Sequence, residues 1–424
     1  MTQIPTLDRR QALAGAMAAA ALVGGSAQAR SRSMAFSEAG LQQMKTLLES
    51  HVAKGSAPGL VALVSRSGEA EVVTAGRMSL DGPAPMRRDA IFRLASMTKP
   101  VTAVAALMLV DEGRLRLDEP VERLLPELAD RRVLRTLSSP VDDTVPATRP
   151  ITVEDVLSFR LGWGVQFDPG LPIQKVVADL PGFGMPNPAS PLTPDAYMRR
   201  LHAVPLMAQP GERWLYTAGS NVLGVLVARA AGKPLDVVFQ ERILGPLGMG
   251  DTGFWIPRDK VGRTVTGYFP QEGKLVLFDA ADGRYAKPPN FPAGDSGLVS
   301  TVDDFAAFAR FLATGLAPDG RRLITQASLK AMRTNHLTPA QMRDGEMILG
   351  PGRGWGYGVG VVVEPNIDGV PPGAYGWNGG FGTSWFNDPA KGLTAILLTQ
   401  RVFDSADPPQ LHKDFWRAAY ASLP

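Results

Sequence analysis

The sequence predicts an α+β fold, in which helices flank one antiparallel sheet and an α-helical domain is inserted between its strands. Strand patterns recur near both ends of the chain. The middle shows short helical patterns between long loops rich in Pro, Asp, Gly and Ser. The 424 residues are 45% hydrophobic and 20% charged. That composition excludes a disordered chain and supplies enough apolar material for a large core.

The first part of the chain predicts a helix, a hairpin and a second helix. Ser37 is a suitable N-cap, and apolar residues then recur at helical spacing, which predicts a helix over residues 37–54. Residues 59–64 form an apolar run that predicts a buried strand, and residues 71–74 predict its hairpin partner. Residues 97–112 predict an apolar helix that is closed by a glycine.

The rest of the chain predicts a change from loops and short helices to strands. Long loops are expected at residues 135–150 and 165–195, and loops of this length are often functional. Further helices are predicted at residues 153–159, 194–201, 221–231, from Thr301 onward and at 411–422, and strands at 358–363, 383–387 and 393–399. We therefore predict a sheet domain of residues 37–115 and 296–424, with a helical and loop-rich domain of residues 116–295 inserted in it. A crevice between the two domains is where a site is expected.

The first 29 residues have the features of an export signal. Arg9-Arg10 precedes an apolar stretch over residues 12–23, and Ala27-Gln28-Ala29 then gives the small-x-small pattern of a cleavage site. Paired arginines before such a stretch are typical of a twin-arginine signal peptide, which predicts a periplasmic or secreted protein. The alternative is a membrane anchor, but so short an apolar helix spans about 18 Å, less than the bilayer core. We therefore expect no stable membrane anchor.

Composition excludes several classes of site. The chain contains no cysteine, so a thiolate zinc site, an iron–sulfur cluster and a cysteine nucleophile are impossible. Its four histidines form no HExxH-type pair, so we expect each to be structural and no metal to be bound. The net charge is +3 and the chain has no block of Lys or Arg, which argues against a nucleic-acid partner.

The first chemical motif is Ser96-Met97-Thr98-Lys99, at the start of the second helix. Ser96 would lie where free N–H groups and the helix dipole favour negative charge, and Lys99 would lie one turn further on. An ammonium group desolvated there would have a lowered pKa and could accept or relay a proton. On these four residues alone, an ordinary capped helix with a solvated lysine is the better explanation.

Two further segments give this motif its context. Tyr216 lies at a junction between a loop and a helix, and a phenol near two cations could ionise and act as a general base. The segment Gly376–Gly382 precedes a predicted strand, and a backbone N–H there could form half of an oxyanion hole. The structural alternatives are a tyrosine that only packs and a glycine-rich turn.

Together and in this order, the three segments resemble the serine β-lactamase and penicillin-binding protein superfamily. The resemblance covers nearly all of residues 37–424, and it is strongest to class C β-lactamases and family VIII carboxylesterases. It implies a β-lactamase-like fold, with Ser96 as the nucleophile, Lys99 as its activator and Tyr216 as the general base. No metal or organic cofactor is implied.

The third segment implies the remaining contacts. The oxyanion hole would consist of the N–H groups of Ser96 and Gly380, with the register between Gly379 and Gly380 left open. Substrate-binding positions would be Trp377, Asn378 and Gly379.

Two departures from the family pattern bear on the substrate. Ala218 replaces the asparagine whose amide holds an acylamino substrate, and Trp377 replaces the cation that binds the carboxylate of a β-lactam or peptide. A tryptophan at this place resembles esterase members of family VIII. The departures favour a small, uncharged substrate.

The sequence therefore predicts an exported serine hydrolase, a short-chain carboxylesterase that cleaves a small-molecule ester through an acyl-enzyme on Ser96. One alternative keeps the site and changes the bond, giving a β-lactamase, a D-peptidase or an amide hydrolase. Another is a non-catalytic peptidoglycan-binding relative, which is less favoured because Ser96, Lys99 and Tyr216 are all present. The oligomeric state is left open.

Overall fold

The computed structural model describes residues 35–366 and 368–424, so the predicted export signal lies outside the described residues. Its main sheet contains the strands β1 (Gly59–Arg66), β2 (Glu69–Gly76), β9 (Arg353–Trp355), β10 (Gly360–Val362), β11 (Tyr375–Gly379), β12 (Thr383–Asp388) and β13 (Leu393–Thr399). Their order across the sheet is β2-β1-β13-β12-β11-β10-β9, and neighbours pair antiparallel. The prediction of an α+β fold around an antiparallel sheet is confirmed.

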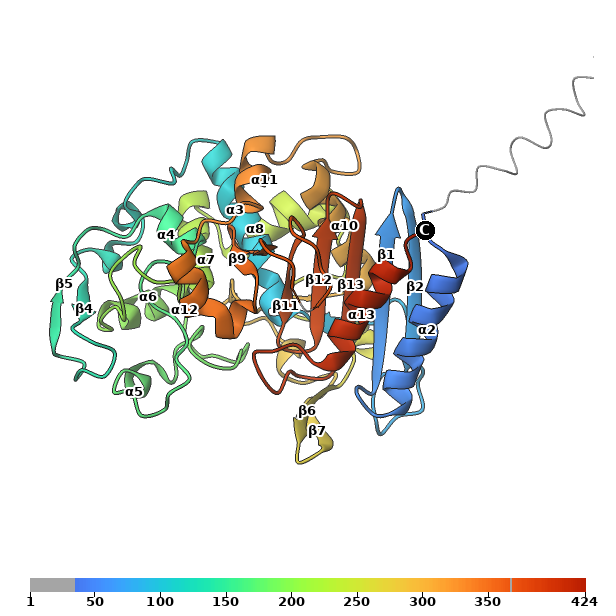
Figure 1. Cartoon of the computed structure of the whole chain (residues 1–424). Helices are drawn as coiled ribbons and strands as arrows, with labels where there is room; N and C mark the ends of the chain where they lie inside the picture. The colour runs from blue at the N-terminus through green and yellow to red at the C-terminus, as the bar shows by residue number, and fades with distance from the viewer. Residues whose placement is uncertain (1–34, 367) are drawn as a thin grey trace, which may run out of the picture.

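One face of the sheet is covered by helices from the two ends of the described chain. The helices α2 (Glu38–Ala53) and α13 (Gln410–Ala421) lie side by side there (Figure 1). Met44 and Leu48 of α2 and Trp416 of α13 are buried in one apolar cluster with the outward side chains of β1 and β13. The backbone N–H of Ser37 donates to the carbonyl of Ser422 across 2.7 Å, which joins the two ends.

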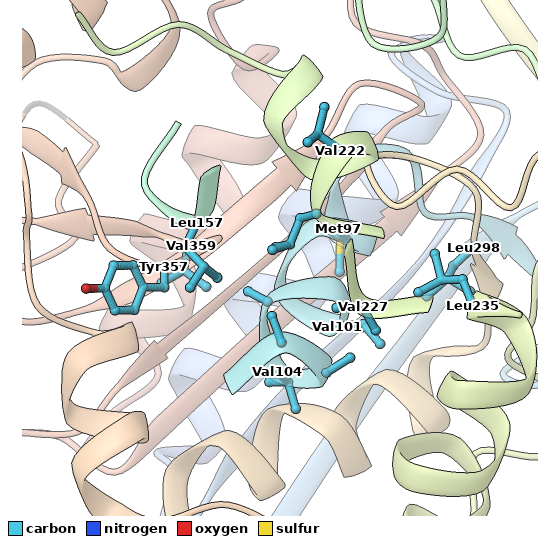
Figure 2. Packing of buried hydrophobic residues seen from close by; sticks show 14 of the residues in the cluster. Met97, Val101, Val104, Leu157, Val222, Val227, Leu235, Leu298, Tyr357 and Val359 are labelled. Atoms are coloured by element: carbon cyan, nitrogen blue, oxygen red, sulfur yellow. The ribbon is translucent and has the colours of Figure 1, made fainter. Parts of the chain in front are cut away.

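The opposite face packs on α3 (Lys99–Asp111) and α10 (Val302–Thr314). Helix α3 is apolar on all sides and almost completely buried, as expected for a helix inside the core. Figure 2 shows Val101 and Val104 of α3 beside Val227 of α7 (Ala218–Ala231), which lies against α3. The burial of α3 fixes its N-terminus, where Ser96 and Lys99 lie.

The middle of the chain is helical and loop-rich (Figure 1, cyan to yellow). Besides α7, its helices are α4 (Val153–Leu157), α5 (Gln174–Val177), α6 (Pro194–His202), α8 (Leu235–Phe239) and α9 (Gly245–Leu247); α11 (Gln326–Met332) and α12 (Pro339–Leu349) follow α10. The described residues also form three small two-stranded sheets: β3 (Phe92–Arg93) with β8 (Val299–Ser300), β4 (Arg132–Leu134) with β5 (Thr144–Pro146), and β6 (Gly267–Gln271) with β7 (Lys274–Asp279). One hydrophobic cluster joins sheet residues such as Val61 to residues of the middle such as Leu201. The domain boundaries at 115/116 and 295/296 stay a prediction.

The structure differs from the sequence prediction at the glycine-rich segment. The sequence predicted no strand over residues 376–382, for which a glycine-rich turn was the structural alternative, but residues 375–379 form the strand β11, in which Trp377 pairs with Trp385 of β12. A Cβ atom on Gly376 would lie 2.0 Å from the carbonyl oxygen of Trp385, so glycine lets the two strands approach closely. Within the described part of the chain, no helix has the length and apolar character needed to cross a membrane.

Candidate active site

Ser96 lies in a tight turn between β3 and α3. This turn is a short 3₁₀ helix, Ala95–Thr98, so the α-helix begins at Lys99, two residues later than predicted. Ala95 has a φ of 44°, a conformation that costs a non-glycine residue about 1–3 kcal/mol. The turn is held by Leu94, whose N–H donates to Leu298 and whose carbonyl accepts from the Thr383 hydroxyl at 3.0 Å. Ser96 itself is partly exposed.

Lys99 is buried directly beside Ser96. Its Nζ donates to Ser96 Oγ at 2.9 Å and to the backbone carbonyl of Asp295, also at 2.9 Å, and the residue is only 1% exposed. Burial lowers the pKa of Lys99 to about 7, although the charge of Asp295 acts in the opposite direction. A substantial fraction of Lys99 is therefore neutral near pH 7, as a proton acceptor for Ser96 requires. Asp295 could not be predicted from the sequence, because it contributes a backbone carbonyl and no side-chain group.

Tyr216 lies on the other side of this pair. The Lys99 Nζ is 4.5 Å from the centroid of the Tyr216 ring, so the cation faces the ring. The phenol oxygen accepts a hydrogen bond from the indole N–H of Trp377 at 2.7 Å. Burial raises the pKa of Tyr216, and hydrogen bonding to Ser96 and Trp377 opposes that rise. The phenol thus keeps its proton near neutral pH, whereas the sequence suggested one that ionises between two cations.

An aromatic cluster surrounds the Tyr216 ring. Trp355 meets it edge-on at a centroid distance of 6.1 Å, and Trp377 lies at 5.6 Å. Trp214 and Phe159 complete the cluster at 5.7 and 5.8 Å. This aromatic cluster holds the Tyr216 ring in place and surrounds it with few polar groups. Trp355 and Phe159 belong to no sequence motif, so their place beside Tyr216 could not be predicted from the sequence.

The predicted oxyanion segment follows Trp377. A Cβ atom on Gly379 would lie 2.0 Å from the carbonyl oxygen of Leu94, so Gly379 packs tightly against the Ser96 turn. A Cβ atom on Gly380 would meet nothing within 4 Å, so Gly380 faces open space. Asn378 is partly exposed, and its Oδ1 has no hydrogen-bond partner among the described residues. The oxyanion and substrate roles of these residues stay predictions.

Ala218, the first departure from the family pattern, is covered by the loop 165–195. A Cβ atom on Gly182 would lie 3.0 Å from the Cα of Ala218 and 2.9 Å from the Asn221 amide nitrogen. Asn221 is directed to other partners, since its Oδ1 accepts from the backbone N–H of Asp295 at 3.1 Å. The loop backbone therefore packs directly against Ala218 at the start of α7.

Each of the four histidines is hydrogen-bonded within the protein. His51 bonds to Asp414 at 3.0 Å, and His202, His336 and His412 each bond to a backbone carbonyl. Over residues 35–366 and 368–424, no group of three or more His, Asp or Glu is placed to hold a metal ion.

A family model described as Beta-lactamase matches residues 44–415. The chain belongs to the β-lactamase family. The chain is 39% identical over 338 residues to Protein Rv1367c of Mycobacterium tuberculosis, covering 78% of this chain and 82% of that protein. It is 32% identical over 380 residues to Esterase EstB of Burkholderia gladioli, covering 83% and 88%.

Solved structures agree with this assignment. EstCE1, described as a hydrolase with promiscuous acyltransferase activity, superposes with a TM-score of 0.77 at 25% identity, covering 90% of this chain and 98% of that one. The β-lactamase-like fold and the resemblance to family VIII esterases are thereby confirmed. These relatives identify the chain as an enzyme, a serine hydrolase of the β-lactamase-like type, and the hydrogen-bonded pair Ser96–Lys99 agrees with that assignment.

Proposed function

We propose that this protein is a short-chain carboxylesterase that cleaves small neutral esters through an acyl-enzyme on Ser96. The observation that carries the proposal is the hydrogen bond from the buried Lys99 Nζ to Ser96 Oγ, next to a protonated Tyr216. The likeness to Esterase EstB supports ester hydrolysis as the reaction.

The contacts support different roles for the two residues: Lys99 as the proton acceptor for Ser96 and Tyr216 as the proton donor to the leaving group. Neutral Lys99 takes the Oγ proton while Oγ attacks the ester carbonyl, and the N–H groups of Ser96 and Gly380 hold the oxyanion. As the tetrahedral intermediate collapses, the bond to the alcohol oxygen breaks and Tyr216 gives its proton to that oxygen. The acyl-enzyme therefore holds a protonated Lys99 and an ionised Tyr216. Water attacks the acyl-enzyme in the second half-reaction, with the same groups acting in reverse.

Hydrolysis of a β-lactam or an amide is the rival at the same site. Two features favour the ester. Ala218 has no side-chain amide for an acylamino group and is packed against Gly182, and the N–H of Trp377 is bonded to Tyr216. Neither feature hinders a small neutral ester, which needs no partner for a carboxylate or an acylamino group.

The decisive experiment uses Ser96→Ala. Alanine fits the same turn, so the melting temperature should stay within a few degrees of wild type while hydrolysis of p-nitrophenyl butyrate falls to background. A fluorophosphonate probe should label the wild type and leave the variant unlabelled. Retention of more than a few per cent of wild-type activity, or labelling of another residue, would place the nucleophile elsewhere.

We also propose that the protein works outside the cytoplasm, in the periplasm or as a secreted enzyme. The support is the sequence pattern of residues 1–29, with its arginine pair, apolar stretch and small-x-small site.

A further inference from the structure

The indole N–H of Trp377 is directed at Tyr216. Trp377 is 4% exposed, its Nε1 lies 2.7 Å from the Tyr216 oxygen, and the edge-to-face contact with Trp355 at 4.7 Å fixes its ring. Its pairing with Trp385 in the sheet fixes its backbone as well. A side chain held in this way cannot turn its N–H toward a substrate without losing the bond to Tyr216.

We propose that Trp377 is a positioning residue that stabilises negative charge on the Tyr216 oxygen while Tyr216 protonates the leaving group, an inference that rests on the proposed esterase function. In that step the Tyr216 proton moves to the leaving alkoxide, and the electron pair of the O–H bond stays on the phenol oxygen. The same oxygen accepts the Trp377 hydrogen bond throughout. Hydrogen bonds to an ionised acceptor are stronger than those to a neutral one, so the contact strengthens as charge develops.

The bond also orients the phenol. A tyrosine hydroxyl has a single proton to donate, and Trp377 donates to its oxygen, so the Tyr216 O–H must point away from the indole. Lys99 cannot replace this contact, because its Nζ lies over the ring, 4.5 Å from the centroid, and its bonds go to Ser96 and Asp295. The tryptophan thus takes over, with a neutral donor, the place that a cation holds in the family pattern.

The test compares two esters with one acyl group, p-nitrophenyl butyrate and ethyl butyrate. A p-nitrophenolate leaves without a proton, whereas an alkoxide needs one, and the acyl-enzyme is the same for both. Trp377→Phe keeps a ring but removes the N–H. We expect it to lower kcat/KM for ethyl butyrate by about ten- to a hundredfold, and to change kcat/KM for p-nitrophenyl butyrate by less than about threefold, because no proton transfer to the leaving group is needed.

Trp355→Phe is the matched control. Trp355 is buried in the same aromatic cluster as Trp377, but its Nε1 has no hydrogen-bond partner within the described part of the chain. Because Trp355 packs against Tyr216 and Trp377 without a hydrogen bond to either, any loss in Trp355→Phe should be the same for both esters. In a Tyr216→Phe background, Trp377→Phe should add no further loss on ethyl butyrate, since the indole acts through the phenol.

Each outcome bears on the proposal. Equal losses on both esters would reduce Trp377 to a packing role, and so would equal losses in Trp377→Phe and Trp355→Phe. No loss on either ester would overturn the proposal outright. Failure of the proposed function is distinct from these results, because wild-type enzyme would then hydrolyse neither ester.

Discussion

Arg93 and Asp279 form an ion pair inside the protein, with an N–O distance of 2.6 Å and both side chains 3% exposed. Arg93 also donates to the backbone carbonyl of Val265 at 2.7 Å. Because Arg93 ends β3, three residues before Ser96, the pair ties the nucleophile's turn to the hairpin β6–β7. Burial lowers the pKa of Arg93, and Asp279 acts against that shift.

The pair predicts a large stability effect. Asp279→Ala should lower the free energy of unfolding by about 3–5 kcal/mol, because it leaves the Arg93 charge buried without its partner. Urea denaturation followed by circular dichroism measures this loss. Asp303→Ala, which breaks an ion pair to Arg88 with both side chains about half exposed, is the control and should have little effect. Similar losses in both variants would contradict the importance of burial.

The pKa of Lys99 predicts the pH dependence of hydrolysis. The neutral amine is the active form, and burial places its pKa at about 7. The kcat/KM for a p-nitrophenyl ester should therefore rise with pH through about 7 and level off above it. Lys99→Arg keeps the charge at every pH, so it should remove the activity across the whole range. A rate that falls as pH increases from 6 to 8 would refute a neutral Lys99 as the proton acceptor.

The two departures in the motifs predict a preference for esters. An anionic β-lactam would lose a charge-assisted hydrogen bond and a neutral one, about 2–4.5 kcal/mol together, or about 30- to 2,000-fold in kcat/KM. Wild-type enzyme should thus hydrolyse short-chain p-nitrophenyl esters readily and nitrocefin or other cephalosporins weakly. Equal or higher kcat/KM on a cephalosporin would make the amide-bond rival the better assignment.

Restoring the family's asparagine at position 218 should fail. Ala218 is fully buried and the backbone of Gly182 packs against it. Ala218→Asn therefore overfills the contact and should destabilise the protein by about 1–3 kcal/mol. We expect a lower melting temperature and no gain in nitrocefin hydrolysis. A gain at unchanged stability would mean that the loop 165–195 gives way to the larger side chain.

The export signal makes a prediction of its own. Arg9→Lys with Arg10→Lys should leave the precursor in the cytoplasm, because the twin-arginine receptor reads that pair. Cell fractionation followed by immunoblotting measures the distribution. The unaltered precursor, expressed in parallel, should reach the periplasmic fraction. Unchanged export of the double variant would point to a different route.

The sequence predicted best those elements whose own residues determine them. Helices α2 and α13 carry apolar residues at helical spacing, and strands β1 and β13 are apolar runs. The structure places these elements, and β12, within a few residues of the prediction. Strand β11 has two glycines and an asparagine in five residues, so it has the local composition of a turn. Its strand conformation depends on pairing with β10 and β12, and this pairing cannot be predicted from the residues of β11 alone.

The site shows the same limit. Ser96 and Lys99 are one helical turn apart, so their contact follows from spacing. The bond between Tyr216 and Trp377 joins residues 161 positions apart, and the Gly182 contact with Ala218 depends on the course of a long loop. The raised pKa of Tyr216 follows from burial, which the sequence does not reveal. Sequence patterns identified the reactive groups, and tertiary packing determined how those groups are protonated and held.

The pairing of β1 with β13 has a consequence for the timing of folding. Residues Leu60 and Thr399 are partners in the sheet, so the first strand of the described chain can pair fully only after its last strand, β13, has been synthesised. Until then β1 and β2 form a hairpin with an unpaired edge, which is prone to aggregation. Because contacts between residues so distant in the chain form slowly, we expect the polypeptide to become active only after its synthesis is complete.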